Sequence, residues 1–157
     1  MYFEVRTKRL TVTEKNTYKT VKELRLFNVV SYTEAESSTY KYMEKKFPGE
    51  DMRIVKIAES KISQVSPSIK DCDMPLWKVK VNVLHENGNG KIRREPVYIL
   101  IQGESSKEVV EAAEIIVRTW ITPTEIVKVE VTKICEVVKE ETPVSAKVEK
   151  PKKTKSN

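Results

Sequence analysis

Apolar and charged side chains alternate along residues 2–10, with Phe3 and Val5 at the first apolar positions. A period of two indicates a β-strand with one buried face and one face in water. The alternation stops over residues 11–20 and returns over residues 21–30. We therefore expect two antiparallel strands joined by a hairpin connection.

A helical period follows the second strand. Ser31 precedes it and Glu34 stands three residues later, which is the spacing of a capping box at a helix N-terminus. The predicted buried stripe recurs every four residues, at Ala35, Thr39, Met43 and Phe47. Pro48 and Gly49 end the helix, and residues 53–62 are expected to form a third strand. Together these segments make a β-β-α-β unit.

The whole unit recurs along the chain. Adding 74 to the residue number takes Phe3 to Trp77 and Ser31 to Ser105, so the first strand and the helix start recur together. After the second helix the offset is 72, which places residues 126–129 on the third strand of the first copy. We interpret this pattern as a tandem duplication. The alternative is two unrelated α+β halves with a similar order of elements.

The predicted fold class is α+β, with mainly antiparallel sheets and one helix per repeat. Residues 1–62 form the first β-β-α-β repeat, residues 76–138 form the second, and the Ser-, Pro- and Asp-rich residues 63–75 link them. A hairpin followed by a helical crossover favours the strand order 2-1-3 in each sheet. Residues 97–102 are apolar on both faces and are expected to form a central strand. The sequence leaves open whether the two three-stranded sheets join edge to edge or pack face to face.

Half of the net charge lies at the C-terminal end of the chain. Residues 139–157 carry six Lys against three Glu and so contribute +3 to the net charge of +6. This basic, Pro- and Lys-rich tail contains no aromatic residue, and we expect it to be disordered unless a partner binds it. The rest of the chain is only mildly basic.

The two cysteines, Cys72 and Cys135, lie 63 residues apart and form no CxxC pair. This spacing favours a reducing compartment over a zinc site or a disulfide framework, although a disulfide between the two stays open. The N-terminus lacks the basic and apolar regions of a signal peptide, and no apolar run reaches about 18 residues. We expect an intracellular protein without a membrane partner.

The sequence contains no pattern typical of an enzyme, a cofactor site or a metal site. His85 flanks a hairpin turn and has no catalytic partner that can be named. Asp71 and Asp73 supply only two carboxylates, in a predicted linker. Gly88 and Gly90 belong to a turn, without the strand-to-helix context of a phosphate-binding loop. We therefore expect a non-enzymatic protein without a cofactor.

Two features suit an acidic partner. The first is the lysine cluster of the tail, which comprises Lys147, Lys150, Lys152, Lys153 and Lys155. Basic arms of this kind bind nucleic acid or other acidic surfaces, and a solubilising terminus is the plain alternative. The second is the wet face of the predicted sheets, which includes Lys78 and Lys80 in the second copy and Glu4, Arg6 and Lys8 in the first. Phe3 and Trp77 fall on the opposite face, which argues against a sheet that stacks bases as RNA-recognition domains do.

Three segments resemble an uncharacterised domain-of-unknown-function family of Bacteroidota and their phages, including crAss-like phages. They are residues 31–36 (SYTEAE), 54–62 (IVKIAESKI) and 76–81 (LWKVKV). The resemblance covers residues 2–138 and supplies no catalytic or binding residue. It implies a phage or prophage setting, in which a small β-rich protein is often part of the virion.

The first functional hypothesis is therefore a non-enzymatic virion component, such as a neck ring, a head–tail connector or a capsid-associated protein. Such a protein would assemble with other chains, as a homo-oligomer or in a larger assembly, through its sheet edges and its tail. The alternative is a nucleic-acid-binding protein that uses the basic tail and the wet face of the sheet. A third hypothesis is an inhibitor of a host protein. The expected location is the virion or the bacterial host cytoplasm.

Overall fold

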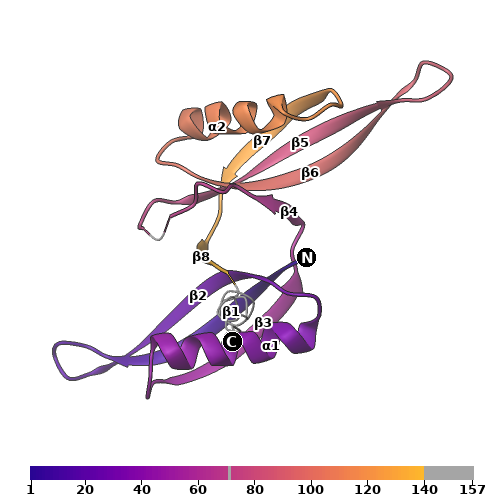
Figure 1. Ribbon diagram of the computed structural model, residues 1–157. Helices are drawn as coiled ribbons and strands as arrows, with labels where there is room; N and C mark the ends of the chain where they lie inside the picture. Colours follow the sequence, from indigo (N-terminus) through magenta and orange to yellow (C-terminus); the bar gives the residue numbers. More distant parts are fainter. Residues whose placement is uncertain (71, 140–157) are drawn as a thin grey trace, which may run out of the picture.

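The computed structural model describes residues 1–70 and 72–139, which form two four-stranded sheets and two helices (Figure 1). The first half contains β1 (Tyr2–Val12), β2 (Tyr18–Asn28), α1 (Tyr32–Lys46), β3 (Asp51–Glu59) and β4 (Ile62–Val65). The second half contains β5 (Leu76–Glu86), β6 (Ile92–Gln102), α2 (Ser106–Arg118), β7 (Thr124–Val131) and β8 (Ile134–Val138). The predicted α+β class, with mainly antiparallel sheets and one helix per half, is confirmed.

Each half begins with a long hairpin that sets its sheet. β1 pairs antiparallel with β2 on one side and with β3 on the other, as the expected order 2-1-3 requires. β5 pairs in the same way with β6 and β7. The hairpin turns use the left-handed backbone region at Asn16 (φ 63°) and Gly90 (φ 78°), which favours Asn and Gly.

The fourth strand of each sheet comes from the other half of the chain. β8 lies parallel to β2, giving the first sheet the order β3-β1-β2-β8, and β4 lies parallel to β6, giving the second sheet the order β4-β6-β5-β7. The expectation of two three-stranded, fully antiparallel sheets was therefore wrong. The segment expected to be a single strand over residues 53–62 is divided, and β4 extends into the segment expected to be a linker.

A side-chain turn causes this division. The Ser60 backbone N–H donates to Tyr2 O (2.8 Å), and the Ser60 side-chain oxygen accepts from the Ile62 N–H (3.1 Å). Thr132 makes the equivalent bonds: its backbone N–H donates to Leu76 O (2.9 Å), and its side-chain oxygen accepts from the Ile134 N–H (3.3 Å). A Ser or Thr hydroxyl that binds a backbone group two residues on redirects the chain. Each turn thus sends the chain out of its own sheet and into the other.

The two halves share their pairing register. The β1–β2 pairing runs from Tyr2 opposite Asn28, and the β5–β6 pairing runs from Leu76 opposite Gln102, 74 positions later. The register shifts between the first and third strands also coincide, at residues 6/7 in the first half and 80/81 in the second. The first three strands of each half therefore pair in the same pattern.

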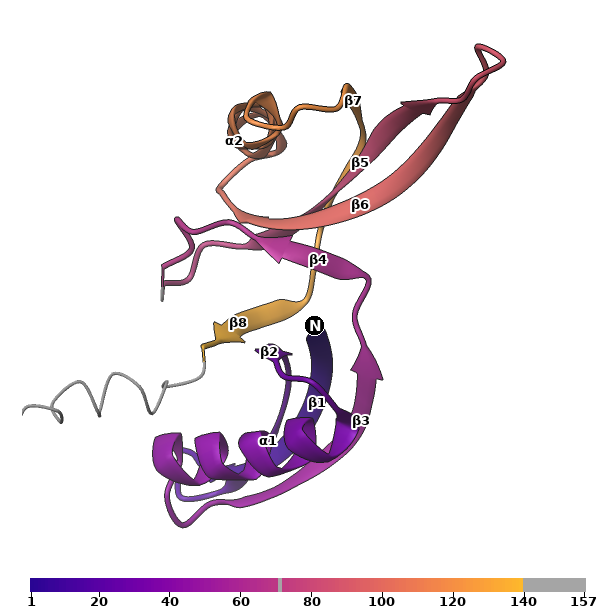
Figure 2. The same cartoon turned by 45° about the vertical axis from the view of Figure 1, so that its right-hand side comes forward.

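Three apolar clusters hold the layers together. One lies between α1 and the first sheet and one between α2 and the second sheet. The third lies between the two sheets and comprises Leu24, Leu26, Ile62, Leu76, Leu100 and Ile134. The sheets therefore pack face to face around the exchanged strands, with the helices outside, and the two hairpins diverge from this contact (Figures 1 and 2). β6 is a central strand, as expected, with Ile99, Leu100 and Ile101 fully buried.

The helices begin as the sequence predicts. The Ser31 side chain accepts from the Glu34 N–H (3.1 Å) and the Ser105 side chain accepts from the Glu108 N–H (3.3 Å), which satisfies one free donor at each helix start. Neither α1 nor α2 combines the length and the apolar character that a membrane crossing requires.

Candidate functional site

The first sheet has a basic face, which is the face turned away from α1. On β1 it carries Arg6 and Lys8, because Val5 and Thr7, which alternate with them, are buried, and Val5 packs in the apolar cluster under α1. Lys22 of β2 lies directly opposite Lys8, and so does Arg53 of β3 on the other side. Lys56 of β3 lies directly opposite Arg6. We define the basic face by these five residues: Arg6, Lys8, Lys22, Arg53 and Lys56.

The side chains of the basic face have no neutralising partner among residues 1–70 and 72–139, since none of the five takes part in an ion pair or a side-chain hydrogen bond there. The same face carries two carboxylates. Glu4 accepts a hydrogen bond from the Ser60 hydroxyl (2.8 Å), and Asp51 lies opposite Leu10 at the end of β3. Like charges directly opposite each other in a sheet are destabilising. The face is therefore suited to an anionic partner.

A shallow hollow of about 220 Å³ adjoins these cations. Lys8 and Arg53 line one side of it, and Leu10, Thr20 and Asp51 line the next row of the sheet. Arg9 and Met52, which lie opposite each other on β1 and β3, complete the lining. The lining thus contains three cationic residues, two apolar residues, one threonine and one carboxylate. It lies on the side of the cations toward the β1–β2 turn.

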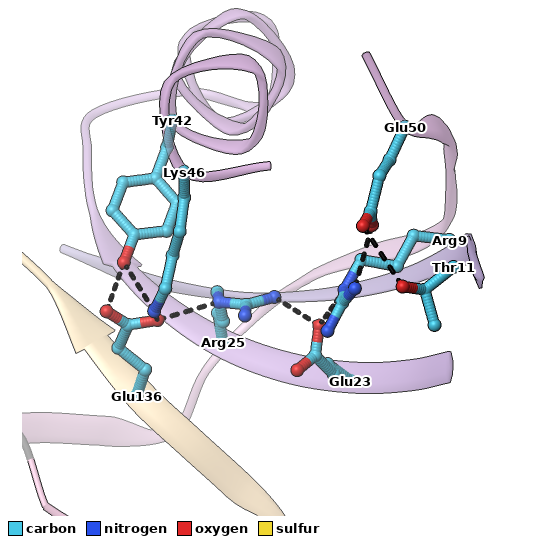
Figure 3. A network of polar contacts seen from close by, with 8 residues as sticks. All are labelled: Arg9, Thr11, Glu23, Arg25, Tyr42, Lys46, Glu50 and Glu136. Carbon is cyan, nitrogen blue, oxygen red and sulfur yellow. Dashed lines mark hydrogen bonds and ion pairs between the residues drawn. The ribbon is translucent and has the colours of Figure 1, made fainter. Parts of the chain in front are cut away.

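The opposite face of the same sheet holds a network of polar contacts under α1 (Figure 3). Arg9 donates from Nε to Glu23 (3.0 Å) and from Nη1 to Glu50 (2.8 Å). Thr11 donates its hydroxyl to the other oxygen of Glu50 (3.1 Å). These contacts join β1, β2 and the segment between α1 and β3.

Arg25 lies at the centre of this network and is 2% exposed. Its Nε donates to Glu136 of β8 (2.8 Å), and its Nη1 lies 3.1 Å from Glu23 at an angle outside hydrogen-bond geometry. The Tyr42 hydroxyl of α1 also donates to Glu136, and so does Lys46 Nζ, at a distance of 3.0 Å. The exchanged strand β8 is therefore fixed to its host sheet by a partly buried carboxylate.

The electrostatics of the network follow from these contacts. Burial acts to raise the pKa of Glu136, but hydrogen bonds from Tyr42, Arg25 and Lys46 outweigh it and hold the pKa below its ordinary value. Burial also acts to raise the pKa of Glu23, but the hydrogen bond from Arg9 and the positive charge of Arg25 outweigh it and lower this pKa. Burial and the bond to Glu136 raise the pKa of the Tyr42 phenol, so it stays a donor. The carboxylates of Glu23, Glu50 and Glu136 are thus held on the α1 side and form no ion pair with the basic face.

Comparison with known families identifies the chain. A family model described as "Domain of unknown function (DUF4494)" matches residues 1–140. The chain belongs to the DUF4494 family. The resemblance noted in the sequence is therefore confirmed. No curated protein and no solved structure matches the chain.

The predicted binding residues Lys78 and Lys80 of this DUF4494 chain lie on the equivalent face of the second sheet. Lys78 lies 3.7 Å from Glu130 and 5.4 Å from the centre of the Tyr98 ring. Lys80 lies directly opposite Lys128, which in turn lies 3.8 Å from Glu130. This face is more nearly neutral than the basic face of the first sheet. The predicted tail residues Lys147, Lys150, Lys152, Lys153 and Lys155 lie outside the described residues.

Other candidates from the sequence occupy separate places. His85 lies 2.8 Å from Glu95 across the exposed end of the β5–β6 hairpin. Cys72 and Cys135 are exposed free thiols. Asp71 lies outside the described residues, and the part of the chain that is described contains no group of three or more metal-binding side chains.

Three residues of the basic face were missed from the sequence: Lys22, Arg53 and Lys56. The alternation of β1 placed Arg6 and Lys8 on the wet face, but it gives no information about neighbouring strands. The register of the hairpin carries that signal, because it sets Lys22 opposite Lys8.

Proposed function

We propose that this protein binds nucleic acid through the basic face of its first sheet. The observation that carries the proposal is the set of like charges that face one another across β1, β2 and β3 without a counterion in the described chain. Their mutual repulsion is relieved when phosphate groups approach. Binding of a polyanion is therefore favoured by an arrangement that otherwise destabilises the sheet.

The spacing of the cations favours a polymer of regular charge. Lys22, Lys8 and Arg53 form one row across three strands, and Arg6 and Lys56 form the next row along them. Neighbouring strands lie about 4.8 Å apart, and rows two residues apart are separated by about 7 Å. Phosphate contacts of this kind supply most of the affinity in sequence-independent binding of nucleic acid.

The test is a titration of fluorescently labelled oligonucleotides, followed by anisotropy at increasing salt from about 50 mM. The variant Arg6→Gln/Lys8→Gln/Arg53→Gln/Lys56→Gln removes four charges from the basic face. We expect it to bind at least about tenfold more weakly and to reduce the slope of log K against log salt by about 0.7–0.9 per lost contact.

The matched control is Lys78→Gln/Lys80→Gln/Arg94→Gln/Lys128→Gln, which removes four charges from the second half. It should bind nearly as well as the unmodified chain. Equal losses in both variants would mean that only net charge matters, and the basic face would then not be the site. No binding of any oligonucleotide at about 50 mM salt would refute the function itself. Deletion of residues 147–157 measures separately how much the tail contributes to the affinity for oligonucleotides.

A second proposal, a phage virion component in the virion or the host cytoplasm, is favoured by the outer edges of the sheets. β3 and β7 are edge strands, and Val55 and Val127 on them are 55% and 51% exposed. Exposed apolar edges suit strand-to-strand assembly with other chains, homo-oligomers included. The test is light scattering of the purified protein together with mass spectrometry of virions. A monomer that is absent from virions would exclude this role.

A further inference from the structure

We propose that the nucleic acid is single-stranded and that one of its bases packs on the ring of Tyr18. This inference rests on the proposed function, since it names the class of nucleic acid that the basic face receives. It is carried by the part of the same face that extends from the cations toward the β1–β2 turn.

Along the hairpin, the side chains of this face change from charged to aromatic over three successive residue pairs. Lys8 pairs with Lys22, then Leu10 pairs with Thr20, and then Val12 pairs with Tyr18. Each pair lies two residues beyond the last on the same face, so Tyr18 stands about 13 Å from Lys22 along β2. A cationic end is thus followed by the hollow and then by an aromatic end.

Tyr18 is presented as an open platform. Its side chain is 75% exposed and makes no hydrogen bond or ring contact with the described residues, and Val12 beside it is 58% exposed. The turn that carries it is tied at its base. The Thr13 N–H donates to Thr17 O (2.8 Å), and the two threonine hydroxyls lie 2.7 Å apart. The backbone that carries the ring is therefore held at the end of the face.

A single strand matches this order of surfaces and a duplex does not. In a duplex the base faces are stacked on each other, so an exposed ring outside the helix cannot reach them. A single strand presents phosphates on one side and free base faces on the other, and aromatic side chains stack on such bases. The cations receive phosphates, and the base that lies beyond the hollow reaches Tyr18.

The second half provides the matched comparison. Ile92 occupies the place of Tyr18, opposite Glu86, and it is also exposed (52%). Arg94 stands one step nearer the cations but is bound to Glu125 (2.9 Å). The aromatic platform and the unpaired cations thus occur together in the first half.

The experiment compares three probes with the full chain: oligothymidylate, a DNA duplex of the same length, and inorganic polyphosphate. We expect the single strand to bind more tightly than the duplex. Tyr18→Ala should weaken binding of the single strand by about 5- to 150-fold, the range expected for loss of one stacked base. Tyr18→Phe should retain binding within about threefold, because the ring is kept. Neither variant should change the binding of polyphosphate, which has no bases.

Ile92→Ala is the control and should leave all three affinities unchanged. Duplex binding equal to that of the single strand, or no effect of Tyr18→Ala on oligothymidylate, overturns this inference and leaves the proposed function standing if the basic-face variant still weakens binding. Failure of the unmodified chain to bind any of the three probes overturns the proposed function as well. Circular dichroism of each variant verifies that the fold is intact.

Discussion

The two halves share one backbone plan but distribute polarity in opposite ways. Under α1 the first half places the network of Figure 3, with Arg25 at its centre. The second half has apolar residues at the equivalent places of Arg9, Glu23, Arg25, Tyr42 and Lys46, namely Val83, Val97, Ile99, Ile116 and Trp120. On the face away from the helix the first half has five cations without an ion-pair partner in the described part of the chain. The second half has Lys80, Asn82, Pro96, Glu125 and Lys128 at those positions.

This difference shows what the network contributes. Glu136 of β8 lies opposite Arg25, and at the same place in the second sheet Gln64 of β4 lies opposite Ile99. If β4 entered the first sheet in place of β8, the buried guanidinium would lose its carboxylate, and Glu136 would face an apolar strand. Buried charges without partners are strongly unfavourable. We therefore expect the Arg25–Glu136 pair to favour β8 over β4 in the first sheet.

The largest effect is expected when this pair is broken from one side. Glu136→Ala leaves Arg25 buried without its main partner and should lower the free energy of unfolding by about 3 kcal/mol. Gln64→Ala, at the equivalent position, should lower it by about 1 kcal/mol or less. Urea denaturation of both variants measures the difference. Similar losses would show that the network does not distinguish the two strands.

Replacing the whole pair should cost much less than breaking it. Arg25→Ile/Glu136→Gln gives the first half the residues of the second, and we expect its free energy of unfolding to lie within about 1–2 kcal/mol of the unmodified chain. The measurement is again urea denaturation, with Arg25→Ile alone as the control. A double variant as unstable as Glu136→Ala would mean that the rest of the network requires the charges.

The network also predicts a dependence of stability on pH. The folded-state pKa values of Glu136 and Glu23 are lowered, so their contribution to stability is complete above the ordinary carboxyl value of 4.5 and is lost as pH falls through the lowered values. The free energy of unfolding should therefore fall when the pH drops below about 4.5. Glu136→Gln should show a flatter profile over this range, and an unchanged slope would contradict the assignment.

The smallest effect is expected from making the second sheet resemble the first. Asn82→Lys/Glu125→Arg introduces two cations at the positions of the second sheet that are equivalent to Lys8 and Arg53. It also removes the carboxylate that binds Arg94. We expect binding of oligonucleotides to become about three- to tenfold tighter at low salt. As a control, Glu111→Arg/Glu114→Gln adds the same three units of positive charge on α2, outside this face. An equal gain in that variant would show a non-specific effect of net charge.

The sequence predicts the elements that depend on local pattern. The alternation of apolar and polar residues predicts the strands of the hairpins. The capping residues Ser31 and Ser105 predict where the helices begin. The apolar residues on both faces of β6 predict its central position. β4 and β8 were missed because strands of four and five residues carry too short a pattern, and because each pairs with a strand of the other half.

The basic face was predicted only on β1, and the network was not predicted. Arg25 stands within the otherwise apolar residues 24–27, where alternation directs it into the core, yet its partner Glu136 is 111 positions away. Pairings at that distance depend on which strands become neighbours, and the local pattern does not contain that information.

The exchange of β4 and β8 also determines the order in which the molecule can be completed during synthesis. The first sheet has its three long strands once residue 59 has been made, but its outer neighbour for β2 is β8, the last strand of the described chain. The edge of β2 therefore stays unpaired until the second half has been translated and folded. An open strand edge is a site of aggregation. A chain that ends between the two halves leaves this edge open, and we expect it to aggregate more readily than the full chain.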